Sequence, residues 1–180
     1  MLENVQKLLD EFKSDVIREA KKNLSKHSSS GKLKNSLRGY VKESKNSIQI
    51  SFEMEEYGFY QDKGVRGVDG KIRNTPYRYT QRGGRGSLKG MPPPKAFDKW
   101  AVRKGIAPRD KEGKFLSRKS LQFMLARSVF MKGIKPTLFF TKPFEKYYKN
   151  LPKELEEKYG LDMINLFDTI TAENFKRLAK

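Results

Sequence analysis

The sequence predicts an α+β fold in which a long N-terminal helix packs on a small antiparallel sheet, with additional helices in a central insertion and at the C-terminus. Over residues 2–24 apolar side chains recur every three or four positions without proline or glycine, which is typical of an amphipathic helix of about six turns. In residues 47–54 apolar and polar residues alternate strictly, as in a strand with one buried face. The inward-facing residues of that strand are Ile48, Ile50, Phe52 and Met54.

Shorter elements are predicted on both sides of this strand. Residues 39–43 favour a strand that forms a hairpin with residues 47–54. Before the hairpin, Leu33 and Leu37 lie one helical turn apart, behind a serine-rich stretch that can supply an N-cap. After it, residues 55–64 begin with acids and end with lysine and glycine, which suits a short aromatic helix that the glycine ends.

The aromatic residues of that short helix are expected to build the core. They follow directly on a half-buried strand, so they are predicted to pack against the apolar stripe of the N-terminal helix. The predicted contacts join Tyr57, Phe59 and Tyr60 to Val5, Phe12 and Val16.

Further helices are predicted in the second half of the chain, where glycine and proline separate apolar periodic segments. Their predicted starting points are Pro92, Ser117, Pro143, Pro152 and Leu161. The helix from Ser117 is expected to end at Gly133 and to carry a largely apolar stripe of Leu121, Met124, Leu125, Ser128 and Val129. Residues 137–141 form a short apolar run, which suits either a strand or a buried extended segment.

The chain is strongly basic, and the charge is concentrated in its middle. It contains 39 Lys/Arg and 21 Asp/Glu, a formal net charge of +18. Residues 63–89 hold eight basic residues and one acid, and residues 95–119 hold nine and three, whereas residues 145–180 are balanced at seven each. A charge of this size implies an anionic partner: nucleic acid, a membrane surface or an acidic protein.

The glycine-rich segment 64–91 is too polar for the core and predicts an arm that contacts nucleic acid or a neighbouring subunit. A solvated loop is the alternative, and residues 75–80 could form one strand of a projecting hairpin. The basic residues of this arm are Lys63, Arg66, Lys71, Arg73, Arg78, Arg82, Arg85 and Lys89.

Several kinds of chemistry have no sequence support. The chain lacks cysteine, and it has no apolar run near the ~20 residues of a membrane span, so neither thiolate chemistry nor a membrane partner is expected. No signal peptide, phosphate-binding loop, zinc spacing or catalytic triad is present, so the sequence predicts no enzyme, metal or cofactor. A metal-dependent nuclease is a remote alternative, from Glu112-Gly113-Lys114 with Asp98 and Asp110.

Three motifs follow one another along the chain. They are S-G-K-L-K-N-S-L at residues 30–37, Y-G-F-Y-Q-D-K-G at residues 57–64, and G-I-K-P at 133–136 followed by F-F-T-K-P-F-E at 139–145. Their order resembles the head–tail connector and tail-completion (neck) proteins of tailed bacteriophages. In that family an S/T-G-x-L-x-x-S-I/L motif follows the first helix, then come a hairpin and a tyrosine-rich segment, and a P-x-x-P-F motif leads into a closing helix.

The resemblance implies a structural virion protein without enzyme activity. Such a protein forms a homo-oligomeric ring, most simply of 12 copies, at the head–tail junction of the virion, after synthesis in the host cytoplasm. Its implied partners are the portal protein, other neck or tail proteins, and the genomic double-stranded DNA that passes through the ring. The basic arm would then contact DNA or the portal.

The resemblance also divides the chain. It covers a connector core of residues 1–64 and 130–150, and leaves a basic insertion at 65–129 and a helical extension at 151–180. The charge-balanced C-terminal region is predicted to contact protein through Phe144, Tyr147, Tyr148, Ile164 and Phe167. The alternative function is a nucleic-acid-binding protein that does not recognise sequence, because basic residues alternate with tyrosines but no recognition motif is present.

Overall fold

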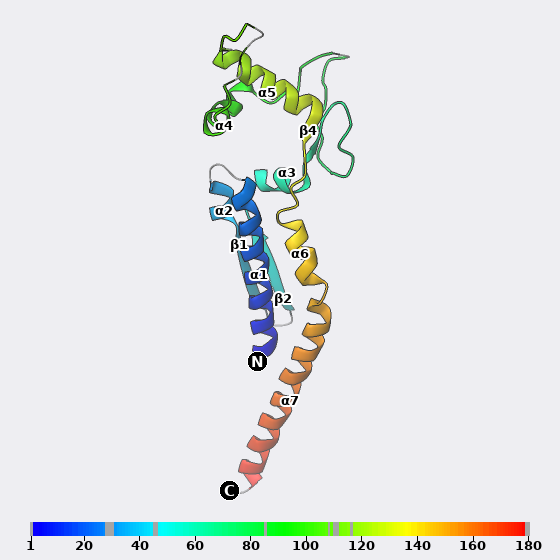
Figure 1. The fold of residues 1–180 in the computed structure, drawn as a ribbon. Helices are drawn as coiled ribbons and strands as arrows, with labels where there is room; N and C mark the ends of the chain where they lie inside the picture. Colours follow the sequence, from blue (N-terminus) through cyan, green and yellow to red (C-terminus); the bar gives the residue numbers. More distant parts are fainter. Residues whose placement is uncertain are drawn as a thin grey trace. The chain divides into compact units, whose positions relative to one another are not determined.

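The computed structural model describes residues 2–27, 31–44, 47–84, 86–107, 109, 112–115 and 117–178 (Figure 1). These residues form helices and two antiparallel two-stranded sheets, which confirms the predicted α+β class. The helices are α1 (Glu3–His27), α2 (Lys32–Ser36), α3 (Tyr57–Lys63), the 3-10 turn η1 (Pro94–Phe97), α4 (Asp98–Arg103), α5 (Arg118–Lys132), α6 (Thr141–Tyr148) and α7 (Leu151–Leu178). The strands are β1 (Arg38–Ser44), β2 (Ser47–Glu53), β3 (Val65–Arg66) and β4 (Gly133–Ile134).

The chain folds as two compact units. Unit 1 comprises Met1–Lys26, Lys34–Met54 and Phe139–Lys180, and unit 2 comprises His27–Leu33 and Glu55–Leu138. This division differs from the predicted one, because residues 27–33, 55–64 and 130–138 of the predicted connector core lie in unit 2 and residues 151–180 lie in unit 1. The short aromatic helix α3 belongs with the basic insertion, and the C-terminal helix α7 belongs with the N-terminal helix.

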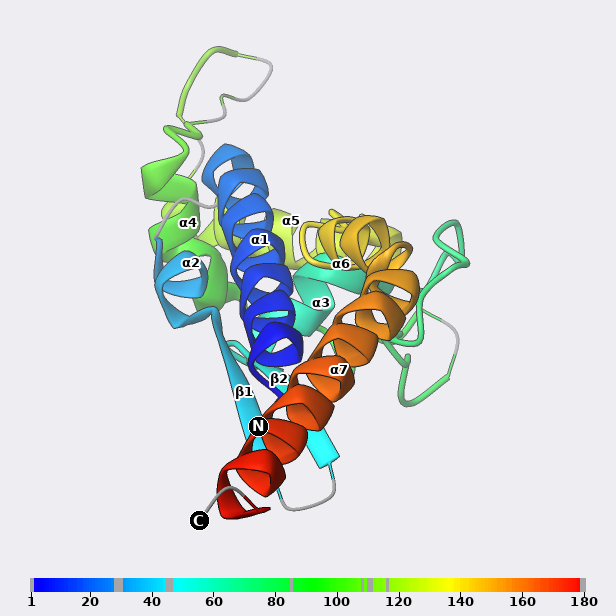
Figure 2. The same ribbon diagram turned by 90° about the horizontal axis from the view of Figure 1, so that it is seen from below.

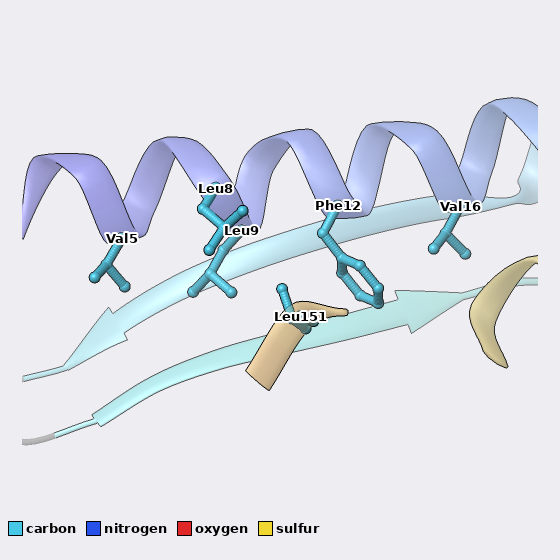
Figure 3. Packing of buried hydrophobic residues seen from close by; sticks show 6 residues of the cluster. All are labelled: Val5, Leu8, Leu9, Phe12, Val16 and Leu151. Atoms are coloured by element: carbon cyan, nitrogen blue, oxygen red, sulfur yellow. The ribbon is translucent and has the colours of Figure 1, made fainter. Parts of the chain in front are cut away.

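In unit 1, α1 lies along the β1–β2 hairpin, as the sequence predicts (Figures 1 and 2). The hairpin is antiparallel in a register that pairs Arg38 with Glu53 and Ser44 with Ser47. Figure 3 shows the apolar stripe of α1 directed at the hairpin, with Leu151 of α7 beside it. The buried cluster consists of Val5, Leu8, Leu9, Phe12, Val16 and Leu151, and the strand residues Ile48, Ile50 and Phe52 pack against it.

Aromatic residues that follow unit 2 in the sequence complete this core. The Phe12 ring lies edge-on to Phe52 and Phe144, at centroid distances of 6.4 Å and 5.7 Å. The Phe52 ring lies 5.2 Å from that of Phe140, and Phe139 is 1% exposed. Residues about 90 positions after the hairpin therefore cover its apolar face.

The prediction that Tyr57, Phe59 and Tyr60 pack against α1 is wrong. Their exposed fractions are 42%, 45% and 39%, and all three lie in unit 2. The reason is that Phe140 and Phe144 occupy the position expected for them.

The C-terminal region forms one helix where two were predicted. α7 runs from Leu151 to Leu178 and passes through Gly160 without a break. Pro152 lies in its first turn, where the missing N–H costs nothing because it has no partner within the helix. Within unit 1, α7 continues past the N-terminal end of α1 (Figure 1). No helix among the described residues is both long and apolar enough to cross a membrane.

Asp162 of α7 caps the start of α1. Leu2 precedes that helix and has no side-chain acceptor for the first N–H groups. The Asp162 carboxylate accepts hydrogen bonds from the backbone N–H groups of Asn4 at 3.1 Å and Val5 at 3.0 Å, and from Asn4 Nδ2 at 2.8 Å. Burial by itself raises the pKa of Asp162, but these hydrogen bonds outweigh it and lower the pKa below its ordinary value.

Replacing Asp162 by alanine is expected to lower stability at pH 7 by about 1–2 kcal/mol, the usual cost of a lost cap. Because the folded-state pKa is depressed, this stabilisation is complete above the unfolded pKa of about 3.9 and is lost as the pH falls through the folded value. Thermal unfolding of parent and variant at pH 7 and near pH 2 checks this. Asp168→Ala, at an exposed position of α7, is the matched control. A difference between D162A and the parent that does not shrink in acid would contradict the cap.

In unit 2, α5 has the predicted ends but a rotated buried face. The Ser117 hydroxyl accepts a hydrogen bond from Ser120 N at 3.1 Å, and Gly133 ends the helix with φ 84°. Of the predicted stripe, Leu121 is buried, while Met124 and Ser128 are exposed. The buried residues Leu121, Ala126 and Phe130 lie four or five residues apart along the helix. Other apolar residues of the helix, such as Phe123 and Met124, are exposed, so the sequence does not distinguish the buried positions from the exposed ones.

Candidate functional site

The basic arm is fixed at its base against the end of α5. β3 and β4 pair Val65 with Ile134 and Arg66 with Gly133. Beyond this pair, Val68 N donates to Phe130 O at 3.1 Å. At Gly67 a Cβ atom would lie 2.1 Å from Met131 O, so the two backbones pass too closely for any side chain. The arm therefore begins as an ordered part of unit 2.

Farther out, the arm folds back on itself instead of forming the predicted strand at 75–80. Arg66 N donates to Tyr77 O at 2.8 Å and Tyr79 N to Arg66 O at 2.9 Å, which makes one isolated parallel bridge to Arg78. The Thr75 hydroxyl donates to Gly64 O at 2.7 Å. These bonds hold Tyr77, Arg78 and Tyr79 next to α3.

The structure spreads the predicted basic residues over this arm. Lys63 ends α3 and is half-buried, whereas Arg85 lies outside the described residues. The remaining members of the set are exposed: Arg66, Lys71, Arg73, Arg78, Arg82 and Lys89. Of the set, Arg78 lines the hollow described next.

Unit 2 contains an open hollow of about 1150 Å³ with an aromatic and basic lining. Tyr57 and Tyr60 line it from α3, Tyr77, Arg78 and Tyr79 from the arm, and Trp100, Arg103 and Lys104 from α4 and its C-cap. Val65, Ile134 and Thr137 are among its other lining residues, and none of the described residues that line it is Asp or Glu. We call this feature the aromatic hollow.

The aromatic rings of the hollow support one another and keep polar edges. Tyr60 and Tyr77 meet edge-on at a centroid distance of 4.6 Å, and Tyr79 packs edge-on to the buried Phe130 at 5.9 Å. Burial raises the pKa of Tyr79; burial and, after it, the charge of Glu55 raise the pKa of Tyr57. Both phenols are therefore neutral near pH 7 and can donate hydrogen bonds. The hollow can bind an apolar or aromatic group that carries negative charge.

Sequence reasoning missed the α4 contribution to this hollow. Trp100, Arg103 and Lys104 are three and four residues apart, the spacing that places side chains on one helical face. That spacing was a usable signal, but the positive charge of residues 95–119 was assigned to the region as a whole. Trp100 is 39% exposed, although its neighbour Ala101 is buried.

The residues of the nuclease alternative have other roles or lie in an exposed loop. The Asp98 carboxylate accepts hydrogen bonds from Arg118 Nη2 at 2.8 Å and Gln122 Nε2 at 2.6 Å, which link α4 to α5. The hydrogen bond from Arg118 is the main reason that the pKa of Asp98 is lowered. Glu112 and Lys114 form an exposed ion pair at 3.5 Å, and Asp110 lies outside the described residues. In the described part of the chain no group of three or more His, Cys, Asp or Glu side chains could hold a metal ion.

The predicted protein-contacting residues separate into two groups. Phe144 and Tyr147 are half-buried and pack against the core of unit 1. Tyr148, Ile164 and Phe167 are 51%, 59% and 69% exposed. The second group is the one that a partner could contact.

The positive charge follows the division into units. Unit 2 contains 21 of the 39 Lys/Arg but 7 of the 21 Asp/Glu, a formal net charge of +14. Unit 1 contains the other 18 and 14, a net charge of +4. Anionic groups are therefore attracted mainly to unit 2.

Comparisons of the chain with protein-family models, with curated proteins and with solved structures each gave no match.

Proposed function

We propose that this chain is a structural subunit of the head–tail connector of a tailed bacteriophage, which joins the capsid portal to the tail as a ring. The observation that carries the proposal is the packing of the two separated parts of the motif series. Phe140 and Phe144, from the closing motif, contact Phe12 and Phe52, from the helix and hairpin at the start of the series. The parts of the predicted connector core at residues 1–26, 34–54 and 139–150 thus share one unit, although residues 55–138 lie between them in the sequence and belong to unit 2.

The segregation of charge supports the same proposal. A connector subunit needs one part that holds the assembly together and another that meets DNA or an acidic partner. Unit 1 is nearly balanced, whereas unit 2 has a net charge of +14 and an arm with six described basic residues at the surface. In a ring this arm is repeated in every copy, so each copy needs little affinity for phosphate of its own.

Localisation in the virion tests the proposal. In particles that contain a tagged copy of the chain, a gold label on the tag is expected at the junction of head and tail, and untagged particles are the control. Label over the capsid shell or on the tail fibres would overturn the assignment.

A second candidate function is nucleic-acid binding without sequence recognition. The positive charge of unit 2 and its exposed tyrosines, Tyr57 and Tyr60, favour it. The isolated chain distinguishes the two. A connector subunit is expected to bind duplex DNA weakly at physiological salt, with log affinity falling by about 0.9 per neutralised phosphate for each tenfold rise in salt. A dedicated binder keeps useful affinity at that salt as a monomer or dimer.

A further inference from the structure

The outer part of α7 has an apolar face that nothing in unit 1 covers. Leu161, Ile164, Phe167 and Ile170 follow one another at steps of three residues, and their exposed fractions are 47%, 59%, 69% and 49%. Asp162 of the same helix bonds to the first N–H groups of α1, and beyond that level α7 continues past the start of α1 (Figure 1). Each step of three residues turns by about 60° around the helix, so neighbours in the row share a side, whereas Leu161 and Ile170 lie on opposite sides. The adjacent Ile164 and Phe167 are the most exposed of the four and mark the interaction surface.

The same part of α7 is free of positive charge. Residues 159–175 contain no Lys or Arg, although basic residues make up 39 of the 180 in the chain. They contain three acids, and one of these, Asp168, is exposed between the apolar residues. This segment is therefore an apolar helix with a weakly negative character in an otherwise basic protein.

The aromatic hollow of unit 2 has the complementary character. Tyr57, Tyr60 and Trp100 are about two-fifths exposed within it. Its charged lining residues are Arg78, Arg103 and Lys104, with no acid among the described lining residues. Its volume of about 1150 Å³ exceeds the roughly 300–1,000 Å³ of pockets for small ligands, which suits large side chains from a helix better than a single small molecule.

We propose that residues 159–171 of α7 in one copy dock into the aromatic hollow of the next copy, and that this contact joins the copies of the ring. The inference rests on the proposed connector function. Phe167 and Ile164 are the apolar anchors, and Asp168 meets the cations at the edge of the hollow. A helix that presents anchors at three- and four-residue steps to an apolar groove is a common mode of recognition. Because the two surfaces differ, the contact is head-to-tail, and such contacts close into rings when the rotation between copies permits.

A second copy is favoured over nucleic acid as the occupant for one reason. One chain supplies both the uncovered apolar helix and the apolar hollow, whereas nucleic acid would cover the hollow and leave the helix exposed.

Disulfide cross-linking between two differently tagged single-cysteine chains tests the contact, because the natural chain has no cysteine. A chain with Phe167→Cys, mixed with a chain with Tyr60→Cys, is expected to give a disulfide-linked heterodimer. The pair of Phe167→Cys with Met124→Cys is the control, since Met124 is 45% exposed on α5 and does not line the hollow. The mixtures are tested as concentrated protein and after co-assembly into particles.

Self-association provides the second measurement. Phe167→Ala is expected to weaken it about tenfold or more, as for a central aromatic anchor, and Tyr40→Ala, which truncates an exposed aromatic residue of β1, is expected to change it little. Phe167 is 69% exposed, so its truncation leaves unit 1 folded.

No heterodimer in either preparation would overturn the proposal. So would tight binding of a single-stranded oligonucleotide that Trp100→Ala abolishes while self-association persists, which would assign the hollow to nucleic acid. A specific cross-link in chains whose label lies elsewhere in the virion would keep the contact and reject the connector function. Label at the head–tail junction without the cross-link would reject the contact alone.

Discussion

Replacing Phe12 by alanine is expected to lower the free energy of unfolding of unit 1 by about 3–5 kcal/mol. Phe12 is 7% exposed at the centre of the buried cluster, and its ring meets both Phe52 of the hairpin and Phe144 of α6. Truncation removes the apolar burial and both edge-to-face contacts, and it leaves a cavity between three elements that are fixed by their other contacts. A loss of this size is a large part of the roughly 5–15 kcal/mol that stabilises a domain.

Thermal unfolding measures the effect. For a chain of this length about 3–5 kcal/mol corresponds to a fall in Tm of roughly 6–20 °C. Phe59→Ala is the matched control, because it removes the same side chain from a position that is 45% exposed, and a change of less than about 1 kcal/mol is expected. If F59A destabilises the protein as much as F12A, the core of unit 1 is assigned incorrectly.

This pair of variants also shows where sequence reasoning failed. The alternation in residues 47–54 identified β2 and its inward face, and the stripe of α1 gave Val5, Phe12 and Val16. Both patterns are local. The residues that cover the hairpin come from Phe139 onward, and hydrophobic periodicity does not distinguish them from the nearer aromatic residues of α3. The Pro143-Phe144 motif was the available signal, because Pro143 is buried and Phe144 joins the core.

The candidate site was predictable in composition but not in shape. Glycine and basic residues marked the arm, and Ser117 and Gly133 marked the ends of α5. The hollow depends on three segments that are far apart in the sequence: α3, the arm at Tyr77 and α4. The arm is held by backbone hydrogen bonds of Arg66 to Tyr77 and Tyr79, and α4 is linked to α5 by the hydrogen bonds that Asp98 accepts. No residue pattern predicts either set of bonds.

The C-terminal helix shows a different limit. Pro152 and Gly160 suggested a break, because both are poor helix formers. Proline in a first turn costs little, and one glycine costs only about 1 kcal/mol, which the remaining residues of a 28-residue helix offset. Propensity therefore gave the wrong division. Ile164 and Phe167 of α7 are exposed, and their contact with a partner stays a prediction.

Replacing Gly133 by alanine is expected to have the largest effect in unit 2, with a loss of about 2–5 kcal/mol from backbone strain together with broken backbone hydrogen bonds. Gly133 adopts φ 84° and ψ −170°, a conformation that is essentially restricted to glycine. A Cβ atom there would lie 2.1 Å from Val65 O and 2.5 Å from Gly67 N. Those atoms belong to the backbone of β3 and the residue after it, so they cannot turn aside as a flexible side chain would.

Gly133→Ala is also expected to affect the arm. β4 must separate from β3 to admit the methyl group, and β3 carries the Arg66 groups that bond to Tyr77 and Tyr79. Loss of these bonds is expected to free the arm and to remove one wall of the aromatic hollow. Hydrogen exchange of the Arg66 and Tyr79 amides measures this directly, and faster exchange of both is expected in the variant.

Gly105→Ala separates the effect of backbone strain from the effect of the close contact between β3 and β4. Gly105 also has a positive φ, of 63°, but no atom lies within 4 Å of its Cβ position, so alanine there adds only the left-handed strain of about 1–2 kcal/mol. The Arg66 and Tyr79 amides should exchange as in the parent when Gly105 is replaced. If G133A and G105A lose the same stability and leave these amides equally protected, close contact between β3 and β4 does not hold the arm. If G133A alone exposes them, the close approach of two glycine-containing backbones is what positions the basic arm beside the hollow.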